Sequence, residues 1–270
     1  SKSLKLVNND KFYQMVDPGF ASRIFNDFET GIEELAAMKP DLILLRDFER
    51  QKYERSLEQL GIRCAFFSLE DPTKYPAEIE TLSIIFGEPA RGAEIARFYL
   101  GWQQRIAGRL RKYKSAFPDV LHVYPADKSG AVAHHVTTPP EAAPPRVLHL
   151  YYSAKGGAVS FNVAPSRWIQ TWLVEQAGAR AVWKEAGIGN GWQQIGFDQI
   201  AAWQPEYMFM TSYGSDVVMA KQHLLKDPLR AEMAAVRQGK LYAFPEDFVC
   251  WDQPDSRLIL GLCWLSAMLW

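Results

Sequence analysis

The chain repeats one pattern of apolar and polar positions in two places that lie far apart. Residues 32–45 read IEELAAMKPDLILL and residues 197–210 read FDQIAAWQPEYMFM. Each segment has an acidic second residue, Ala-Ala at its centre and a proline at its ninth position, followed by an apolar run. Since proline cannot continue a helix, each segment predicts a short amphipathic helix that ends before the proline. The apolar run predicts a strand buried on both faces of a parallel sheet.

The remaining hydrophobic pattern predicts further strand–helix units and one unusually long helix. Residues 90–114 contain no proline and carry apolar side chains at three- and four-residue spacing, which favours a single helix. Such a helix either covers a sheet or bridges two lobes, and its place between the repeated halves favours the bridge. Shorter helices are predicted over residues 56–60, 166–175 and 257–270, and strands over residues 63–68, 147–152 and 240–244.

These elements predict an α/β fold of two Rossmann-like lobes, each with a central parallel sheet, bridged by the long helix. The predicted divisions are an N-terminal lobe over residues 1–89, the bridging helix over 90–116, a C-terminal lobe over 117–252 and a closing helix over 253–270. The proline-rich residues 125–145, which include His134 and His135, are expected to form a loop or a decorated connection.

The composition limits the classes of function. The 270 residues are 48% hydrophobic with a formal net charge of −1, which fits a globular protein and disfavours nucleic acid, whose phosphates need clustered Lys and Arg. Cys64, Cys250 and Cys263 share no metal-ligand spacing and cannot all pair, so no disulfide framework is predicted. The apolar residues 258–270 are too few to span a bilayer. No signal segment opens the sequence, whose first residues are typical of a trimmed chain.

Signatures of catalysis and of metal binding are absent from the sequence. It contains no Gly-x-Ser-x-Gly elbow, and residues 187–192 (GIGNGW) do not complete a dinucleotide fingerprint. The histidines form no i, i+4 pair, so neither catalytic residues nor a metal site are assigned. An α/β enzyme that uses Asp47 or Asp216 as a base stays open as an alternative.

Aromatic and basic side chains gather where the predicted strands end. The carboxyl ends of parallel strands meet at one edge of a sheet, where open α/β sheets bind their ligands. Such a surface suits a large planar or multi-ring anion, through stacking and charge-assisted hydrogen bonds. For each aromatic residue the alternative is packing in the core, and for each arginine it is a solvated surface position. The candidate ligand-binding residues are Arg46, Phe48, Tyr151, Tyr152, Lys155, Arg167, Trp168, Trp192, Tyr213 and Trp251.

The pattern resembles a known family, the periplasmic solute-binding proteins that serve importers of ferric siderophores, haem and cobalamin. The segments that carry the resemblance are GIEELAAMKPDLIL, LEQLGIRCAFFS, WIQTWLVEQAGA, WQQIGFDQIAAWQPEYMFM and AVRQGKLYAFPEDFVCWDQPDSRLILGLCWLSAML, in the order of the family. The family consists of two lobes on one long helix. Members normally have a strand and a helix ahead of the first repeated unit, and only about thirty residues precede that unit here. The resemblance therefore implies an N-terminal lobe without its first strand–helix unit.

The resemblance also implies a function. It points to a monomeric receptor, periplasmic or anchored outside the cell, that carries a metal chelate to an ABC-type permease and needs no cofactor. A ferric siderophore is the first expectation, and haem, cobalamin and molybdate are the rivals within the class. A nitrogenase-like metallocluster protein shares the architecture, but three scattered cysteines argue against it.

Particular residues take expected roles from the resemblance. Trp192 falls where cobalamin receptors have a tryptophan in the cleft, and Tyr151 and Trp251 fall near other cleft positions. Arg46 stands where those receptors have an aromatic residue, which favours an anionic chelate. Glu33 and Asp198 occupy equivalent places in the two repeated helices. On the residues alone, helix-dipole stabilisation explains this pair; in the family, the equivalent carboxylates dock on arginines of the permease, one from each lobe.

Overall fold

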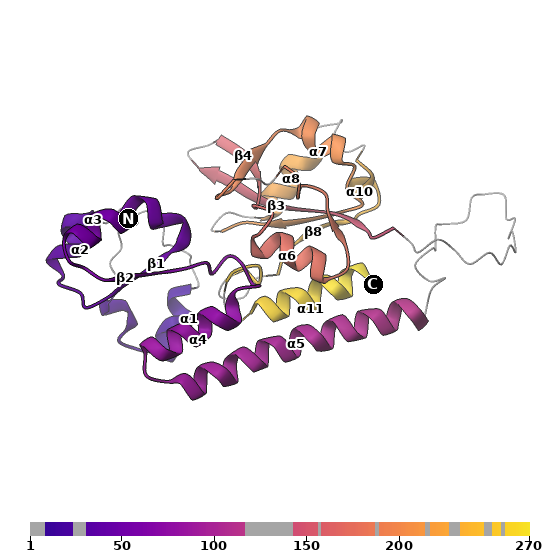
Figure 1. Ribbon diagram of the computed structural model, residues 1–270. Coiled ribbons are helices and arrows are strands. Elements are labelled where there is room, and N and C mark those ends of the chain that lie inside the picture. Colours follow the sequence, from indigo (N-terminus) through magenta and orange to yellow (C-terminus); the bar gives the residue numbers. More distant parts are fainter. Residues whose placement is uncertain are drawn as a thin grey trace, which may run out of the picture.

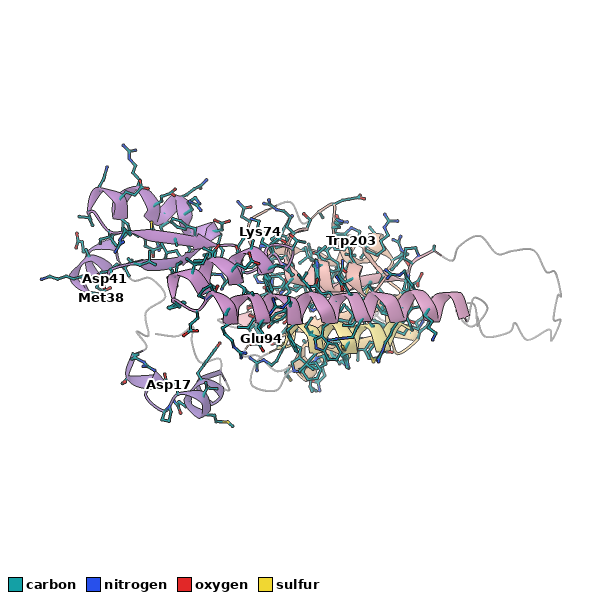
Figure 2. The ribbon with its side chains drawn as sticks, turned by 60° about the horizontal axis from the view of Figure 1, so that its bottom comes forward. Asp17, Met38, Asp41, Lys74, Glu94 and Trp203 are labelled. Atoms are coloured by element: carbon teal, nitrogen blue, oxygen red, sulfur yellow. The ribbon has the colours of Figure 1, made fainter. Side chains whose placement is uncertain are left out.

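A single long helix, α5 (Pro89–Ala116), runs along one side of the computed structural model shown in Figure 1. The structure describes residues 9–23, 31–116, 143–155, 158–186, 189–213, 217–226, 233–245, 250–254 and 257–270. Seen from below, α5 passes both the N-terminal and the C-terminal part of the molecule (Figure 2). It packs against α4 (Tyr75–Ile85) in the first part and against α11 (Leu258–Leu269) in the second. The predicted long helix between two lobes is therefore confirmed.

The N-terminal lobe contains a two-stranded parallel sheet. β1 (Ile43–Arg46) pairs with β2 (Cys64–Phe67), with Ile43 opposite Cys64. The prediction that β1 is buried on both faces is wrong, because Leu44 is 40% exposed and no residue of β1 is fully buried. Within the ranges given above, β1 has one neighbouring strand, so its faces are only partly covered. The helices of this lobe are α1 (Asn9–Val16), η1 (Phe20–Arg23), α2 (Ile32–Ala37), η2 (Asp47–Glu49), α3 (Arg50–Gln59) and α4.

The C-terminal lobe is built on a larger sheet with the strand order β6–β4–β3–β7–β8, in which β5 also pairs with β3. The pairs β3–β5, β3–β7 and β7–β8 are parallel, as predicted, whereas β4 runs antiparallel to both β3 and β6. The hairpin from β3 to β4 was not predicted, although Gly-Gly between two alternating runs is a hairpin signal. The strands are β3 (Arg146–Lys155), β4 (Ala158–Val163), β5 (Arg180–Ala181), β6 (Gln193–Ile195), β7 (Tyr207–Thr211) and β8 (Leu241–Ala243).

Helices cover both faces of this sheet and enclose the main hydrophobic core. In Figure 1, α6 (Ile169–Gln176) and α11 lie between the sheet and α5. The other face carries α7 (Phe197–Trp203), α8 (Val217–Leu225) and α10 (Ala234–Arg237). Met208, Phe209 and Met210 of β7 are fully buried, so the burial predicted for the second repeated strand is correct. The sheet thus presents the continuous apolar strand typical of a parallel sheet covered on both sides.

The repeated sequence pattern corresponds to a repeated structure. α2 and α7 each begin after a glycine, Gly31 or Gly196, in an extended conformation. Each is followed by a residue with positive φ directly before the proline, Lys39 at 48° and Gln204 at 44°. The chain then enters β1 or β7. The two lobes therefore use the same helix–turn–strand unit.

Gly261 of α11 allows a close approach that a side chain would prevent. A Cβ atom there would lie 2.4 Å from the backbone oxygen of Trp251. We expect Gly261→Ala to lower the free energy of unfolding by about 1–3 kcal/mol, because the helix or the segment at Trp251 must shift. Gly108→Ala in α5 is the matched control, since a Cβ there meets nothing within 4 Å and alanine favours a helix. Chemical denaturation of both variants tests this; equal stabilities would contradict it.

Candidate functional site

A pocket of about 270 Å³ lies between the two lobes. The N-terminal lobe lines it with η2 and with the segment after β2, and the C-terminal lobe lines it with the start of α6 and with Asn190. Lys74, labelled in Figure 2, stands at the junction of the two lobes. The lining residues are Asp47, Phe48, Arg50, Ser68, Glu70, Asp71, Lys74, Arg167, Trp168 and Asn190. Both wall segments of the N-terminal lobe follow the carboxyl ends of strands, where ligand sites of open sheets are found.

Arg46 occupies a different place from the one predicted. It is not among the residues that line the pocket, and its guanidinium pairs with the carboxylate of Glu70, with Nε 3.3 Å from Oε2. Burial lowers the pKa of Arg46. The charge expected to meet an anionic ligand is therefore already used within the lobe. Phe48, in contrast, does line the pocket and is 51% exposed.

The carboxylates of the pocket wall have partners. Asp47 lies 3.1 Å from Arg50 and 3.7 Å from Lys74, and Asp71 accepts hydrogen bonds from the backbone N–H and the hydroxyl of Thr73. Asp47, one of the two bases considered for an enzyme, is thus ion-paired within its own lobe. Asp216, the other proposed base, lies outside the described residues.

Arg167 differs from Arg50 and Lys74, the other cations that line the pocket, which both lie near Asp47. It lies one residue before Trp168, the N-cap of α6, and its side chain is exposed. In the part of the chain that the structure describes, no hydrogen bond or ion pair is formed by Arg167. Its guanidinium is therefore available to an anionic group in the pocket.

Four aromatic side chains, which we call the aromatic cluster, extend from the pocket-lining Trp168 into the C-terminal lobe. They are Tyr151, Trp168, Trp192 and Tyr213. The rings of Trp168 and Trp192 meet edge to face at 5.8 Å between centroids. Tyr151 lies 5.0 Å from Trp192 and 5.0 Å from Tyr213. The structure thus brings together four of the predicted residues, all of them half-buried.

Tyr152 does not belong to this cluster and lies in the core, away from the pocket. It is 2% exposed, lies in the hydrophobic core and contacts the ring of Phe161. Successive side chains of a strand point to opposite faces, so Tyr151 and Tyr152 cannot both face the site. Trp251 is half-buried against the core and is not a lining residue of the pocket. Lys155 ends β3, and the placement of its side chain lies outside what the structure describes.

Behind the aromatic cluster lies a buried polar group that the sequence analysis missed. The phenol of Tyr213 donates a 2.9 Å hydrogen bond to Asp252, which is 0% exposed. Burial raises the pKa of Asp252 to about 6. It lowers the pKa of His149, which lies 3.4 Å from the same carboxylate, to about 3. The only sequence signal was that Asp252 follows Trp251 after the end of a predicted strand.

The two carboxylates expected to dock on a permease are both exposed. Glu33 lies in the first turn of α2 and Asp198 in the first turn of α7. Figure 1 shows these helices in different lobes, both on the side away from α5. Each lobe therefore presents one exposed carboxylate from the same position of the repeated unit.

Several other predicted features fall outside the described residues. These are His134, His135 and most of the proline-rich segment. Within the described ranges, no group of three or more His, Cys, Asp or Glu side chains is arranged to hold a metal ion. Likewise, none of the helices described there has the length and apolar character needed to cross a membrane.

Comparisons with known proteins agree with the fold. Residues 124–248 match the family model described as periplasmic binding protein. The vitamin B12 binding protein BtuF of Vibrio cholerae superposes with a TM-score of 0.65 at 17% identity, over 96% of this chain and 86% of that one. The molybdate-binding protein MolA of Haemophilus influenzae gives 0.64 at 20% identity, over 97% and 76%. A periplasmic haem-binding protein of Pseudomonas aeruginosa gives 0.61 at 20% identity, over 88% and 75%.

No curated protein matches the sequence. The predicted resemblance to periplasmic solute-binding proteins is nevertheless confirmed by the family match and by the structural neighbours. The fold is that of the two-lobed binding proteins, with a parallel-rich sheet in the larger lobe. Since the three neighbours are named for unrelated ligands, this fold does not by itself decide what is bound.

Proposed function

We propose that this protein is the solute-binding receptor of an ABC importer, acts in the periplasm or anchored outside the cell, and carries an anionic metal chelate. A ferric siderophore is the first candidate, with haem, cobalamin and molybdate as the other cargoes of the class. The observation that carries the proposal is the pocket between the lobes, with Arg167 beside the aromatic cluster. The bound molecule is cargo that leaves unchanged, so no catalytic residue and no cofactor are assigned.

The charges of the pocket support an anionic cargo. Asp47, Glu70 and Asp71 are each engaged by a cation or a hydrogen-bond donor of the same lobe. Arg167 has no such partner within the ranges described. Lys74 is exposed, and its ammonium lies 3.7 Å from the carboxylate of Asp47. Arg167 is therefore the pocket cation that remains available to a ligand among the residues described. Arg46 does not add to this charge, since it is paired with Glu70.

The aromatic cluster supports a cargo with flat organic groups. Half-buried tryptophan and tyrosine rings offer apolar faces for stacking while their polar edges reach water or protein partners. A chelate presents such an organic surface, because its own oxygen atoms already fill the coordination shell of the iron. Molybdate, which is small and lacks an organic surface, would use Arg167 but not the rings.

A thermal-shift screen tests the proposal. The probes are a ferric hydroxamate, a ferric catecholate, haem, cobalamin and molybdate. A ligand at 100 times its dissociation constant adds about 2.7 kcal/mol, which raises Tm by roughly 5–11 °C when each kcal/mol is worth about 2–4 °C. We expect a ferric chelate to give such a shift. A shift with molybdate alone would contradict the chelate, and no shift with any probe would contradict the receptor.

Replacing Arg167 should weaken the binding of the chelate that shifts Tm. We expect Arg167→Gln to raise its Kd about tenfold or more, because a charge-assisted hydrogen bond is lost. Arg180→Gln is the matched control, since Arg180 is an exposed arginine of the same lobe that does not line the pocket. Isothermal titration of both variants measures the effect, and equal affinities would remove Arg167 from the site.

A further inference from the structure

The ring of Tyr213 is fixed from behind the aromatic cluster by buried partners. Its hydroxyl donates to Oδ2 of Asp252 at 2.9 Å, and Nε2 of Gln170 lies 3.4 Å from the same hydroxyl. Gln170 also donates to the backbone oxygen of Asp252 at 3.1 Å. Both Asp252 and Gln170 are buried. The orientation of a ring in the ligand site thus depends on a carboxylate that the ligand cannot touch.

No cation compensates the charge of Asp252 in the part of the chain that the structure describes. The titratable groups that face it are His149 of β3, with Nε2 3.4 Å from Oδ2, and Tyr213 after β7. Thr211 lies 3.5 Å from Oδ1 and 2.7 Å from the sulfur of Cys250. From α6 it is the neutral amide of Gln170 that faces the carboxylate, and no Lys or Arg contacts it.

The carboxylate therefore titrates within a physiological range. Burial raises the pKa of Asp252 to about 6, while the pKa of His149, lowered to about 3 by burial, keeps the imidazole neutral as the carboxyl takes up its proton. An ionised carboxylate accepts a charge-assisted hydrogen bond from Tyr213, which is about twice as strong as a neutral one. Protonation of Asp252 replaces the strong bond by the weak one, so the ring of Tyr213 becomes less restrained.

We propose that Asp252 is a positioning residue, which holds Tyr213 and with it the aromatic cluster in the orientation that binds cargo, and that protonation of Asp252 loosens the cluster and weakens binding in mildly acidic solution. The inference rests on the proposed function, because it takes the aromatic cluster as the ligand site. The receptor would bind its cargo more tightly at pH 7.5 than at pH 5.

The first test needs no ligand. The protein is labelled with 5-fluorotryptophan, the Trp192 signal is assigned with Trp192→Phe, and ¹⁹F spectra are recorded from pH 4.5 to 8. We expect the Trp192 signal to shift with a midpoint near pH 6, because its ring lies 6.1 Å from that of Tyr213. In Asp252→Asn the signal should not titrate and should stay at the position of the wild type at low pH.

Two further variants keep this test decisive. Tyr213→Phe removes the hydroxyl but keeps the ring, so it should also abolish the titration even if Asp252→Asn folds poorly. Glu206→Gln changes an exposed carboxylate and should leave the titration as it is in the wild type. A Trp192 signal that does not move in the wild type, or that still titrates without the Asp252 carboxylate, would overturn the proposal.

The second test measures affinity with a ferric trihydroxamate at pH 5 and pH 7.5. We expect the wild type to bind about fivefold more weakly at pH 5, because the hydrogen bond that holds Tyr213 is weaker when Asp252 is neutral. Asp252→Asn should bind equally at both values. Equal binding by the wild type would overturn the proposal. No binding at either pH would count against the proposed cargo, while the fluorine titration would still decide the role of Asp252.

Discussion

Uptake should fail when Glu33 and Asp198 are both replaced by alanine, while cargo binding stays unchanged. Both carboxylates are exposed, lie in the first turns of α2 and α7, and do not line the pocket. We propose that they dock on the permease, one from each lobe, so their loss should leave the fold and the ligand site intact but remove both contacts. Each lost charge-assisted contact costs about tenfold in association, so the double variant should reduce uptake by roughly a hundredfold. Transport of a radiolabelled ferric chelate by cells that carry the permease measures this.

The control for this experiment also removes two negative charges, at other exposed positions in or near α2 and α7. Glu34→Ala combined with Glu206→Ala removes two other exposed carboxylates, one in the first turn of α2 and one just after α7. This variant should import at the rate of the wild type. Normal uptake by the Glu33→Ala, Asp198→Ala chain would show that these residues only stabilise their helices.

Replacing Asp252 and replacing His149 should change the pH dependence of stability in opposite directions. The pKa of Asp252 rises on folding from 3.8 to about 6, so its contribution to the free energy of unfolding is present at low pH and is lost as pH rises to 6. The pKa of His149 falls from 6.5 to about 3, so its contribution is present above pH 6.5 and is lost as pH falls. Between pH 4 and 6 the two proton uptakes cancel in the wild type.

Removing one of the two groups should reveal the pH dependence of the free energy of unfolding that is due to the other. Asp252→Asn leaves His149, so the free energy of unfolding should rise by up to about 1.4 kcal/mol per pH unit between pH 4 and 6, relative to the wild type. His149→Gln leaves Asp252, so it should fall by a similar amount over the same range. Urea denaturation at pH 4, 5 and 6 provides the slopes, with Glu206→Gln as an exposed control. Slopes of the same sign in both variants would contradict the assignment.

The repeated helix–strand units could be predicted because their signals are local. A proline at the ninth position ends each helix, and an apolar run begins each strand, whatever surrounds them. The burial of those strands could not be predicted from the segments themselves. The same apolar pattern forms the buried strand β7 and the partly exposed strand β1. The difference lies in the number of neighbouring strands and covering helices, which a single segment does not encode.

The candidate site shows the same division. The end of the first predicted strand indicated Phe48, and the start of a predicted helix indicated Arg167 and Trp168, and all three line the pocket. Chain direction places such positions at one edge of a parallel sheet. Partners could not be predicted in this way. Arg46 is paired with Glu70, 24 residues later, and Tyr213 with Asp252, 39 residues later, and both pairings need the three-dimensional fold. Because side chains alternate along β3, Tyr152 points to the core face opposite to Tyr151.

The small sheet of the N-terminal lobe gives the two halves of the molecule unequal resistance to local opening. Among the residues described, the buried apolar side chains of β1, β2 and α3 are Tyr53, Leu57 and Phe67, whereas the C-terminal lobe contains the large core around Met208 and Phe209. We therefore expect the amide hydrogens of β1 and β2 to exchange through partial unfolding that leaves β3 and β7 closed. A cargo that contacts both lobes binds only when both are folded, so its binding energy is added first to the weaker half. We therefore expect the ligand-bound protein to resist proteolysis better than the free protein, because the ligand adds stabilising contacts to the N-terminal lobe.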